Sequence, residues 1–145
     1  MKAKADNCIF FQLAKAHQSA ARFWKAKLAD TPVTMVQGMV LTFLFEDDQI
    51  TARELGARTT LDSATLTGIL DRLEKAGFIQ RRPHPEDRRA LQVCLTDAGR
   101  NLGGKLLEMG VAANQEFLSP LTTEEQIVLR MLLKKLRNSD SCGKI

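Results

Sequence analysis

The stretch from Leu61 to Phe78 constrains the fold most strongly, because its apolar and polar residues separate onto two faces of a helix. Asp62 or Ser63 can cap the first amides of this helix, and Gly77 can adopt the left-handed conformation that ends it. The apolar positions recur at intervals of three and four residues and are Leu66, Ile69, Leu70, Leu73 and Ala76. The polar face comprises Ser63, Thr67, Asp71 and Glu74, with Thr65, Arg72 and Lys75 beside them.

A second short helix is expected directly before this one. Residues 51–54 have the pattern of a capping box, and Ile50 and Leu55 stand at the positions of a hydrophobic staple. The threonines at 59 and 60 interrupt the apolar pattern, so a tight polar turn joins the two helices. This arrangement is typical of a helix-turn-helix, whose second helix enters the major groove with its N-terminal residues toward the base edges.

After Gly77 the periodicity changes from that of a helix to that of strands. Residues 78–82 and 91–95 are predicted to form two strands. The loop between them, from Pro83 to Arg89, is too long and too rich in proline for a two-residue turn. A hairpin with a basic tip after a helix-turn-helix is expected to form a wing.

Five motifs follow one another in this part of the chain. They are Leu61-Asp62-Ser63-Ala64-Thr65-Leu66-Thr67, the stretch Leu73 to Ile79, Arg81-Arg82, Pro85-Glu86-Asp87-Arg88-Arg89, and the stretch Leu95 to Gly99. This ordered series, which spans roughly a third of the chain, resembles the winged helix-turn-helix of MarR-type transcriptional regulators. The resemblance implies a homodimer that binds a palindromic site in double-stranded DNA, with repression favoured over activation.

Side chains on the second helix and the wing are the candidates for DNA contact. The resemblance implies that Arg89, in an Asp-x-Arg motif with Asp87, reaches the minor groove. Alternative interpretations are ion pairs of Arg72 with Asp71 and of Arg89 with Asp87, and simple capping and solvation for the hydroxyl residues. The full set of candidates is Ser63, Thr65, Thr67, Arg72, Asp87, Arg88 and Arg89.

The chain is predicted to be a single MarR-type domain over residues 1–145, mainly α with a small β-hairpin wing. The winged helix-turn-helix covers approximately 34–96, including a mostly apolar core helix near its start. It is flanked by helices at approximately 6–30 and 97–139, whose apolar residues exceed what one small domain can cover. Since large apolar surfaces are rare on monomers, these helices are expected to join two subunits, as the resemblance also implies. Gly103 and Gly104 indicate close helix packing or a hinge.

Composition supports this interpretation without establishing it. With 145 residues, 44% hydrophobic and 26% charged, the chain is neither disordered nor fibrous. Residues 51–105 carry ten Lys or Arg against seven Asp or Glu, although a basic patch is more often only a solvated face. No apolar run reaches the roughly 18 residues of a membrane span, and no signal core follows the start, so a soluble cytoplasmic protein is expected.

The sequence gives no reason to expect an enzyme, a metal site or a cofactor. It contains no nucleophile with a paired base, no carboxylate pair suited to catalysis and no glycine-rich phosphate loop. Its three cysteines are widely spaced, without the histidine companions of a zinc site. The alternative is a protein-interaction module on a winged-helix fold, which sequence-selective, salt-dependent duplex binding would exclude.

The resemblance further implies control by a small effector, an aromatic acid or a hydroperoxide, that reaches a cleft between the dimer helices and the winged module. Aromatic and methionine side chains at helical spacing belong to the core more often than to a pocket, which is the alternative for these residues. The candidates for lining the cleft are His17, Phe23, Trp24, Met35 and Met39.

The stretch Asn7 to Phe10, with the motif at 61–67, is also similar to the organic-hydroperoxide-sensing branch of the family. This similarity implies that Cys8 is a peroxide-reactive thiol, with Cys142 of the other subunit as its resolving partner. If Asp6 caps the first helix, Cys8 falls in the first turn, where the amide dipoles favour a thiolate. The tyrosines that hold the thiolate in that branch align with Gln12 and Arg22 here, which favours an inert thiol.

Overall fold

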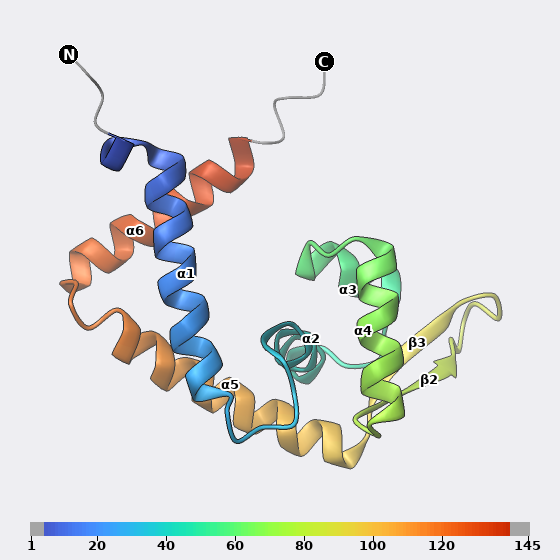
Figure 1. The fold of residues 1–145 in the computed structure, drawn as a ribbon. Helices are drawn as coiled ribbons and strands as arrows, with labels where there is room; N and C mark the ends of the chain where they lie inside the picture. The colour runs from blue at the N-terminus through green and yellow to red at the C-terminus, as the bar shows by residue number, and fades with distance from the viewer. Residues whose placement is uncertain (1–4, 140–145) are drawn as a thin grey trace. The chain divides into compact units, whose positions relative to one another are not determined.

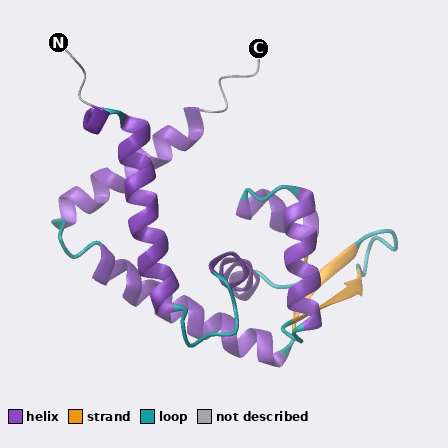
Figure 2. Cartoon of the chain, viewed as in Figure 1, coloured by secondary structure: helices purple, strands orange, loops and turns teal. Residues whose placement is uncertain are grey.

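The computed structural model describes residues 5–139 and contains two compact units, one ending at Val111 and the other beginning at Ala112. Helices dominate, and the strands belong to one small sheet (Figure 2). The predicted class, mainly α with a winged helix-turn-helix, is confirmed. In chain order the elements are η1 (Ala5–Asn7), α1 (Ile9–Lys27), α2 (Met35–Glu46), β1 (Ile50–Thr51), α3 (Ala52–Thr59), α4 (Ser63–Lys75), β2 (Ile79–Pro83), β3 (Leu91–Leu95), α5 (Asp97–Phe117) and α6 (Thr123–Ser139) (Figure 1).

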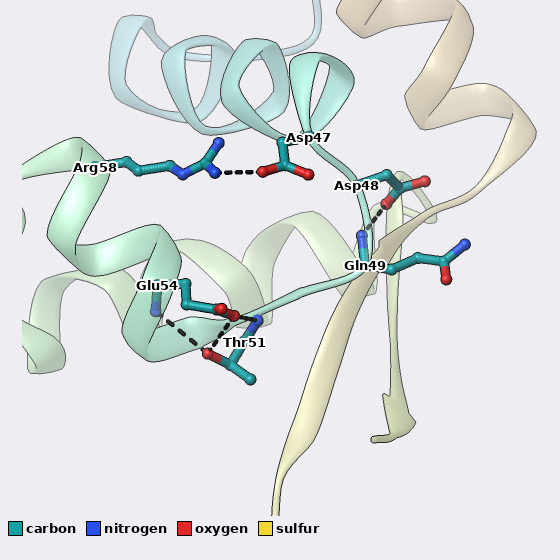
Figure 3. Close-up of polar contacts among 6 residues, drawn as sticks. All are labelled: Asp47, Asp48, Gln49, Thr51, Glu54 and Arg58. Carbon is teal, nitrogen blue, oxygen red and sulfur yellow. Dashed lines mark hydrogen bonds and ion pairs between the residues drawn. The ribbon is translucent and has the colours of Figure 1, made fainter. Parts of the chain in front are cut away.

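Side-chain caps fix where the helices of the first unit begin. At α2 the Gln37 N–H donates to the Thr34 hydroxyl at 3.3 Å, and the Thr34 N–H donates to the Gln37 side chain at 2.9 Å. Thr51 and Glu54 repeat this reciprocal pattern at α3, with the Thr51 N–H 2.7 Å from the Glu54 carboxylate (Figure 3). The capping box predicted at residues 51–54 is confirmed, and the box at α2 is of the same kind. Each satisfies amide groups that the first helical turn leaves unpaired.

The sheet has three antiparallel strands in the order β1-β3-β2. β2 and β3 form the predicted hairpin, with Ile79 opposite Leu95 and Pro83 opposite Leu91. β1 pairs Ile50 with Val93. The sequence does not predict this strand, because two residues are too few to show the alternation of a strand. Through β1, the start of α3 is hydrogen-bonded to the base of the wing.

One apolar core holds the first unit together, and α2 lies within it as expected. Burying each leucine contributes about 1.5–3 kcal/mol, so these residues dominate the stability of the unit. The core positions with almost no exposure are Val40, Leu41, Leu44, Leu55, Leu70, Leu73, Ile79 and Val93.

The first part of α5 packs closely on this core through glycines. A Cβ at Gly103 would lie 3.1 Å from the Leu41 carbonyl oxygen and 3.1 Å from the Phe45 Cβ, so the packing interpretation of the Gly103-Gly104 pair is supported. At Gly99 a Cβ would lie only 1.8 Å from the Phe78 carbonyl oxygen, so that position admits no side chain. The helix that leaves the wing therefore starts in backbone contact with it.

The second unit contains the end of α5 and all of α6. The Gln126 side chain donates to the carbonyl oxygens of Leu118 and Leu121 at 3.2 Å each, which holds the turn between the two helices. Thr122 and Glu125 form a further capping box at the start of α6. Within residues 5–139, no helix is both long and apolar enough to cross a membrane.

Candidate nucleic-acid interface

The second helix of the helix-turn-helix is α4, and Asp62 caps it. One Asp62 carboxylate oxygen accepts the Thr65 N–H at 2.8 Å, and the other accepts the Thr65 hydroxyl at 2.6 Å. The hydroxyl and N–H of Thr65 together lower the pKa of Asp62, because both bonds favour its charged form. At the other end, Gly77 has φ 81°, as predicted for the residue that stops the helix.

The outer face of α4 carries the hydroxyl candidates, all of them exposed. The Thr65 hydroxyl donates to Asp62, and the Thr67 hydroxyl donates to the Ser63 carbonyl oxygen at 2.8 Å. Their oxygens keep lone pairs toward solvent, so both can accept a hydrogen bond from a base or a phosphate-bound water. The Ser63 hydroxyl donates to no group within residues 5–139, so it can either donate or accept a hydrogen bond at a base edge.

Arg72 does not pair with Asp71, contrary to one alternative drawn from the sequence. Asp71 instead accepts a hydrogen bond at 2.7 Å from Arg81 of β2, and the Arg81 guanidinium also pairs with Glu74. The Arg81 N–H adds a third bond, to Glu74 at 2.9 Å. Partial burial opposes the charge on Arg81, but the two carboxylates outweigh it and raise its pKa. Asp71 and Glu74 thus tie α4 to the wing strand through Arg81. Arg72 stays exposed.

The wing tip is held by two side chains of its own. The His84 Nδ1 accepts the N–H groups of Glu86 at 3.1 Å and Asp87 at 3.2 Å. Asp87 in turn accepts the Arg89 N–H at 2.9 Å through its carboxylate. Asp87 therefore shapes the turn through the backbone of Arg89, and Arg88 and Arg89 present exposed cationic side chains. The cations of the wing are evident from the sequence, whereas the hydrogen bonds of His84 are evident only from the fold.

Two aspartates after α2 join the helix-turn-helix to the elements around it. Asp47 pairs with Arg58 of α3 (Figure 3). The Asp48 carboxylate accepts the N–H of Gln49 at 2.8 Å and that of Leu95 at 2.9 Å, and it also pairs with Arg100 of α5. Asp48 thereby connects α2, β3 and α5 in one place.

An apolar hollow of about 490 Å³ opens between the end of α1 and the start of α2. Of the predicted pocket residues, Met35 lines it. Trp24 packs on the core, Phe23 lies under the Lys27 ammonium at 5.2 Å, Met39 is half-buried, and His17 is exposed on α1. Lys25 supplies a cation to the lining, which consists of Ala21, Lys25, Leu28, Ala29, Val33, Thr34 and Met35.

Cys8 is exposed, and it is the N-cap of α1 rather than a member of its first turn. The helix starts later than Asp6 capping would require, because residues 5–7 form a separate 3-10 turn and the Cys8 carbonyl oxygen accepts the Gln12 N–H at 3.0 Å. Cys94 is buried in β3; burial, and then the Asp48 charge, raise the pKa of its thiol. Cys142 lies outside the described residues. Residues 5–139 contain no cluster of three potential metal ligands.

Known proteins share this sequence pattern over much of the chain. The MarR family model matches residues 33–91. The transcriptional regulator TtmR of Methylorubrum extorquens is 37% identical over 101 residues, which are 70% of this chain and 52% of TtmR. The chain thus spans about half the length of that relative. The organic hydroperoxide resistance transcriptional regulator of Bacillus subtilis is 31% identical over 106 residues, 73% of this chain and 72% of the relative.

Solved structures share the fold as well. A cysteine-to-serine mutant of MarR from E. coli, crystallised in complex with operator DNA, superimposes with a TM-score of 0.82 and 30% sequence identity. The match covers 92% of this chain and 99% of the MarR chain.

Proposed function

This chain belongs to the MarR family of transcriptional regulators, and on that premise we propose that it is a repressor controlled by a small effector. It binds DNA through its winged helix-turn-helix and is not an enzyme. The proposal adds that a cytoplasmic homodimer recognises a palindromic site, with residues 1–145 acting as one MarR-type domain. A ligand or oxidant then releases the dimer from the DNA.

The observation that carries this proposal is the pairing of a capped helix with a cationic wing. On α4 the exposed Ser63, Thr65, Thr67 and Arg72 lie on the side away from the buried leucines. On the wing, Arg88 and Arg89 extend from a tip that His84 and Asp87 hold in shape. We assign the α4 residues to the major groove and Arg89 to the minor groove. Hydroxyl groups and the Arg72 guanidinium can hydrogen-bond to base edges, and an extended arginine suits a narrow groove.

The test begins with selection of a duplex from a random library by the wild-type protein. Fluorescence anisotropy then compares the selected duplex with a scrambled one between 50 and 200 mM salt, a range over which about six phosphate contacts would cost about a thousandfold in affinity. Palindromic enrichment and a steep salt dependence are expected. Affinity indifferent to both sequence and salt would instead favour a protein-interaction module on the same fold.

The Arg89→Ala variant examines the wing. It is expected to lower the salt slope by about one unit if the guanidinium contacts one phosphate, and to weaken binding to every duplex. If Arg89 instead reads the width of the minor groove, the loss will depend on the flanking sequence. Lys105→Ala, an exposed cation on α5, is the matched control and should leave the slope unchanged.

The effector is proposed to be a small aromatic acid that binds the hollow between α1 and α2. Its apolar lining suits a ring, and the Lys25 ammonium suits a carboxylate. A ligand here would displace the start of α2. Because α2 is also a core helix of the winged module, this displacement would change the distance between the α4 helices of the two subunits. Because both half-sites must be met about one helical turn apart, a small shift suffices.

Benzoate and a panel of hydroxybenzoates test this step by their release of the selected duplex. Lys25→Met should weaken the response about tenfold while leaving DNA affinity in the absence of acid unchanged. Lys15→Met on the same helix is the control, because Lys15 lies over the Phe11 ring, outside the lining. Identical DNA binding with and without every acid in the panel would remove support for this effector class.

A hydroperoxide acting on Cys8 is the second candidate effector, favoured by the exposure of this thiol and by the similarity to the hydroperoxide resistance regulator of Bacillus subtilis. Cumene hydroperoxide should then release DNA from the wild type and from Cys94→Ser but not from Cys8→Ser, by oxidising the thiolate to a sulfenic acid. Loss of an intersubunit crosslink in Cys142→Ser would identify the resolving thiol. Equal release from wild type and Cys8→Ser would contradict peroxide sensing.

A further inference from the structure

Gly68 lies in the middle of α4, where glycine weakens a helix. Relative to alanine, an interior glycine lowers the folding equilibrium constant by a factor of about two to five. Its backbone is not in the left-handed region, which in residues 5–139 is occupied by Gln49, Thr60 and Gly77. Conformational freedom therefore does not explain why position 68 is a glycine.

Packing inside the protein does not explain it either. A Cβ built at Gly68 would meet no atom within 4 Å. At Gly99 and Gly103, by contrast, a Cβ would lie 1.8 and 3.1 Å from backbone oxygens, so those positions have an internal reason to lack a side chain. In the described part of the protein, the space around Gly68 is therefore open and could hold a side chain.

The position of Gly68 on α4 indicates what approaches it. The helix buries Leu66, Ile69, Leu70 and Leu73 on its inner side. Gly68 lies on the other side, four residues before the exposed Arg72 and next to the exposed Thr67. It therefore occupies the face that a helix-turn-helix turns toward the major groove.

We propose that Gly68 is the point of closest approach between α4 and the base pairs of the major groove. The missing Cβ lets the helix backbone lie against the base edges, as glycine does where a backbone approaches a ligand. This closeness has a second effect, because Ser63 and Thr67 have short side chains that reach base edges only from a helix seated deeply. The inference rests on the proposed DNA-binding function and adds a specificity-determining residue to it.

The Gly68→Ala variant tests the proposal by separating stability from binding. Urea unfolding should show a folding equilibrium constant about two to five times that of the wild type. Anisotropy with the selected duplex should show binding weakened about tenfold, while the scrambled duplex, held mainly through phosphates, changes little. Gly68→Leu, with a longer side chain, should lose still more selectivity.

Gly110→Ala on α5 is the matched control, since a Cβ there would lie at an ordinary 3.7 Å from the Trp24 ring. It should not change duplex selectivity. If the wild type selects a duplex and Gly68→Ala binds it equally well, this inference is wrong while the proposed function stands. If Gly68→Ala is less stable than the wild type, an internal reason for the glycine exists and the inference also fails. A wild type that selects no duplex would overturn the proposed function itself.

Discussion

Thr60 has a backbone conformation that suits its β-branched side chain poorly. It ends α3 with φ 55°, in the left-handed region that β-branched residues rarely adopt. The strain is tolerated because the turn between α3 and α4 must reverse the chain within a few residues, and the Thr60 hydroxyl gains a 2.7 Å bond to the Thr59 carbonyl oxygen. A residue that adopts this conformation more readily should therefore stabilise the protein.

Thr60→Asn is expected to raise the free energy of unfolding by about 0.5–1 kcal/mol, because asparagine adopts the left-handed conformation more readily. Thr60→Val keeps the branched side chain and removes the hydroxyl, so it should destabilise the protein. Urea unfolding followed by circular dichroism measures both. Equal stability of the asparagine and valine variants would show that the turn stores no strain at this residue.

At the scale of elements, two acidic caps make the helix-turn-helix sensitive to acid. Hydrogen bonds from Thr51 lower the pKa of Glu54 at the start of α3, and those from Thr65 lower the pKa of Asp62 at the start of α4. A carboxyl group whose pKa is lower in the folded state stabilises the protein above its unfolded pKa, here about 4.5 for Glu54 and 3.8 for Asp62. This stabilisation is lost as the pH falls through the folded value.

Stability should accordingly decline below about pH 4, and Asp62→Asn should make the decline shallower, because an amide does not titrate. Unfolding by urea at a series of pH values between 2.5 and 7 measures the slope. Glu108→Gln on α5, which is exposed and lies outside these caps, is the control. A slope for Asp62→Asn that matches the wild type would mean that the cap does not contribute to acid sensitivity.

The wing depends on the acceptor at residue 84. His84→Ala removes the group that accepts the N–H bonds of Glu86 and Asp87, so the tip should become less ordered and duplex affinity should fall about fivefold. His84→Asn should retain most of the affinity, because an asparagine oxygen accepts backbone N–H groups two and three residues on. Anisotropy with the selected duplex compares the three proteins. Equal losses in both variants would assign His84 a role other than shaping the loop.

The elements that the sequence predicts well are those whose signals are local. Capping boxes, the glycine after α4 and the two wing strands each depend on residues within a few positions of one another, and the structure contains them. The start of α1 was placed too early, since a 3-10 turn and a helix end share the same short-range pattern. Arg81 lies 10 residues from Asp71, and Leu95 and Arg100 lie 47 and 52 residues from Asp48, so only the fold could identify these partners.

In the candidate site, too, some features follow from local sequence signals and others only from the fold. Exposed hydroxyls and cations follow from the helical period and the wing loop, and they lie where the sequence indicated. The wing arginines depend on His84, and Gly68 gains its meaning only when the surroundings of its missing Cβ are known. Both effects arise from contacts, or their absence, that no single-sequence pattern records.

At the scale of the whole molecule, each unit exposes large apolar side chains. On α1 the side chains of Ile9 and Phe10 are 55% and 79% exposed, and on α6 Ile127 is 63% exposed. Further half-exposed apolar residues of α6 are Val128, Met131, Leu132, Leu133 and Leu136. Such surface is normally covered by a partner. If the partner is a second copy of the chain, the dimer has the two-fold symmetry that matches a palindromic DNA site.

Phe10→Glu and Leu132→Glu are therefore expected to weaken dimerisation at least about thirtyfold each, because a charge would replace an apolar side chain on a face that the proposed dimer covers. Sedimentation velocity over a range of concentrations measures the dissociation constant. Lys134→Glu changes the charge at an exposed position of α6, the helix that carries Leu132. It is the control for a change of charge and should leave the dimer intact.

The same variants connect assembly to function. A monomer contacts one half-site, so both glutamate variants should bind the full palindrome no more tightly than an isolated half-site. The wild-type dimer should bind the full palindrome more tightly, because its two subunits contact both half-sites at once. Circular dichroism establishes that each variant remains folded, which separates loss of the dimer from loss of structure. Intact dimers in both glutamate variants would show that the two faces have another use. Monomers that still bound the full palindrome as tightly as the wild type would show that recognition does not need the second subunit.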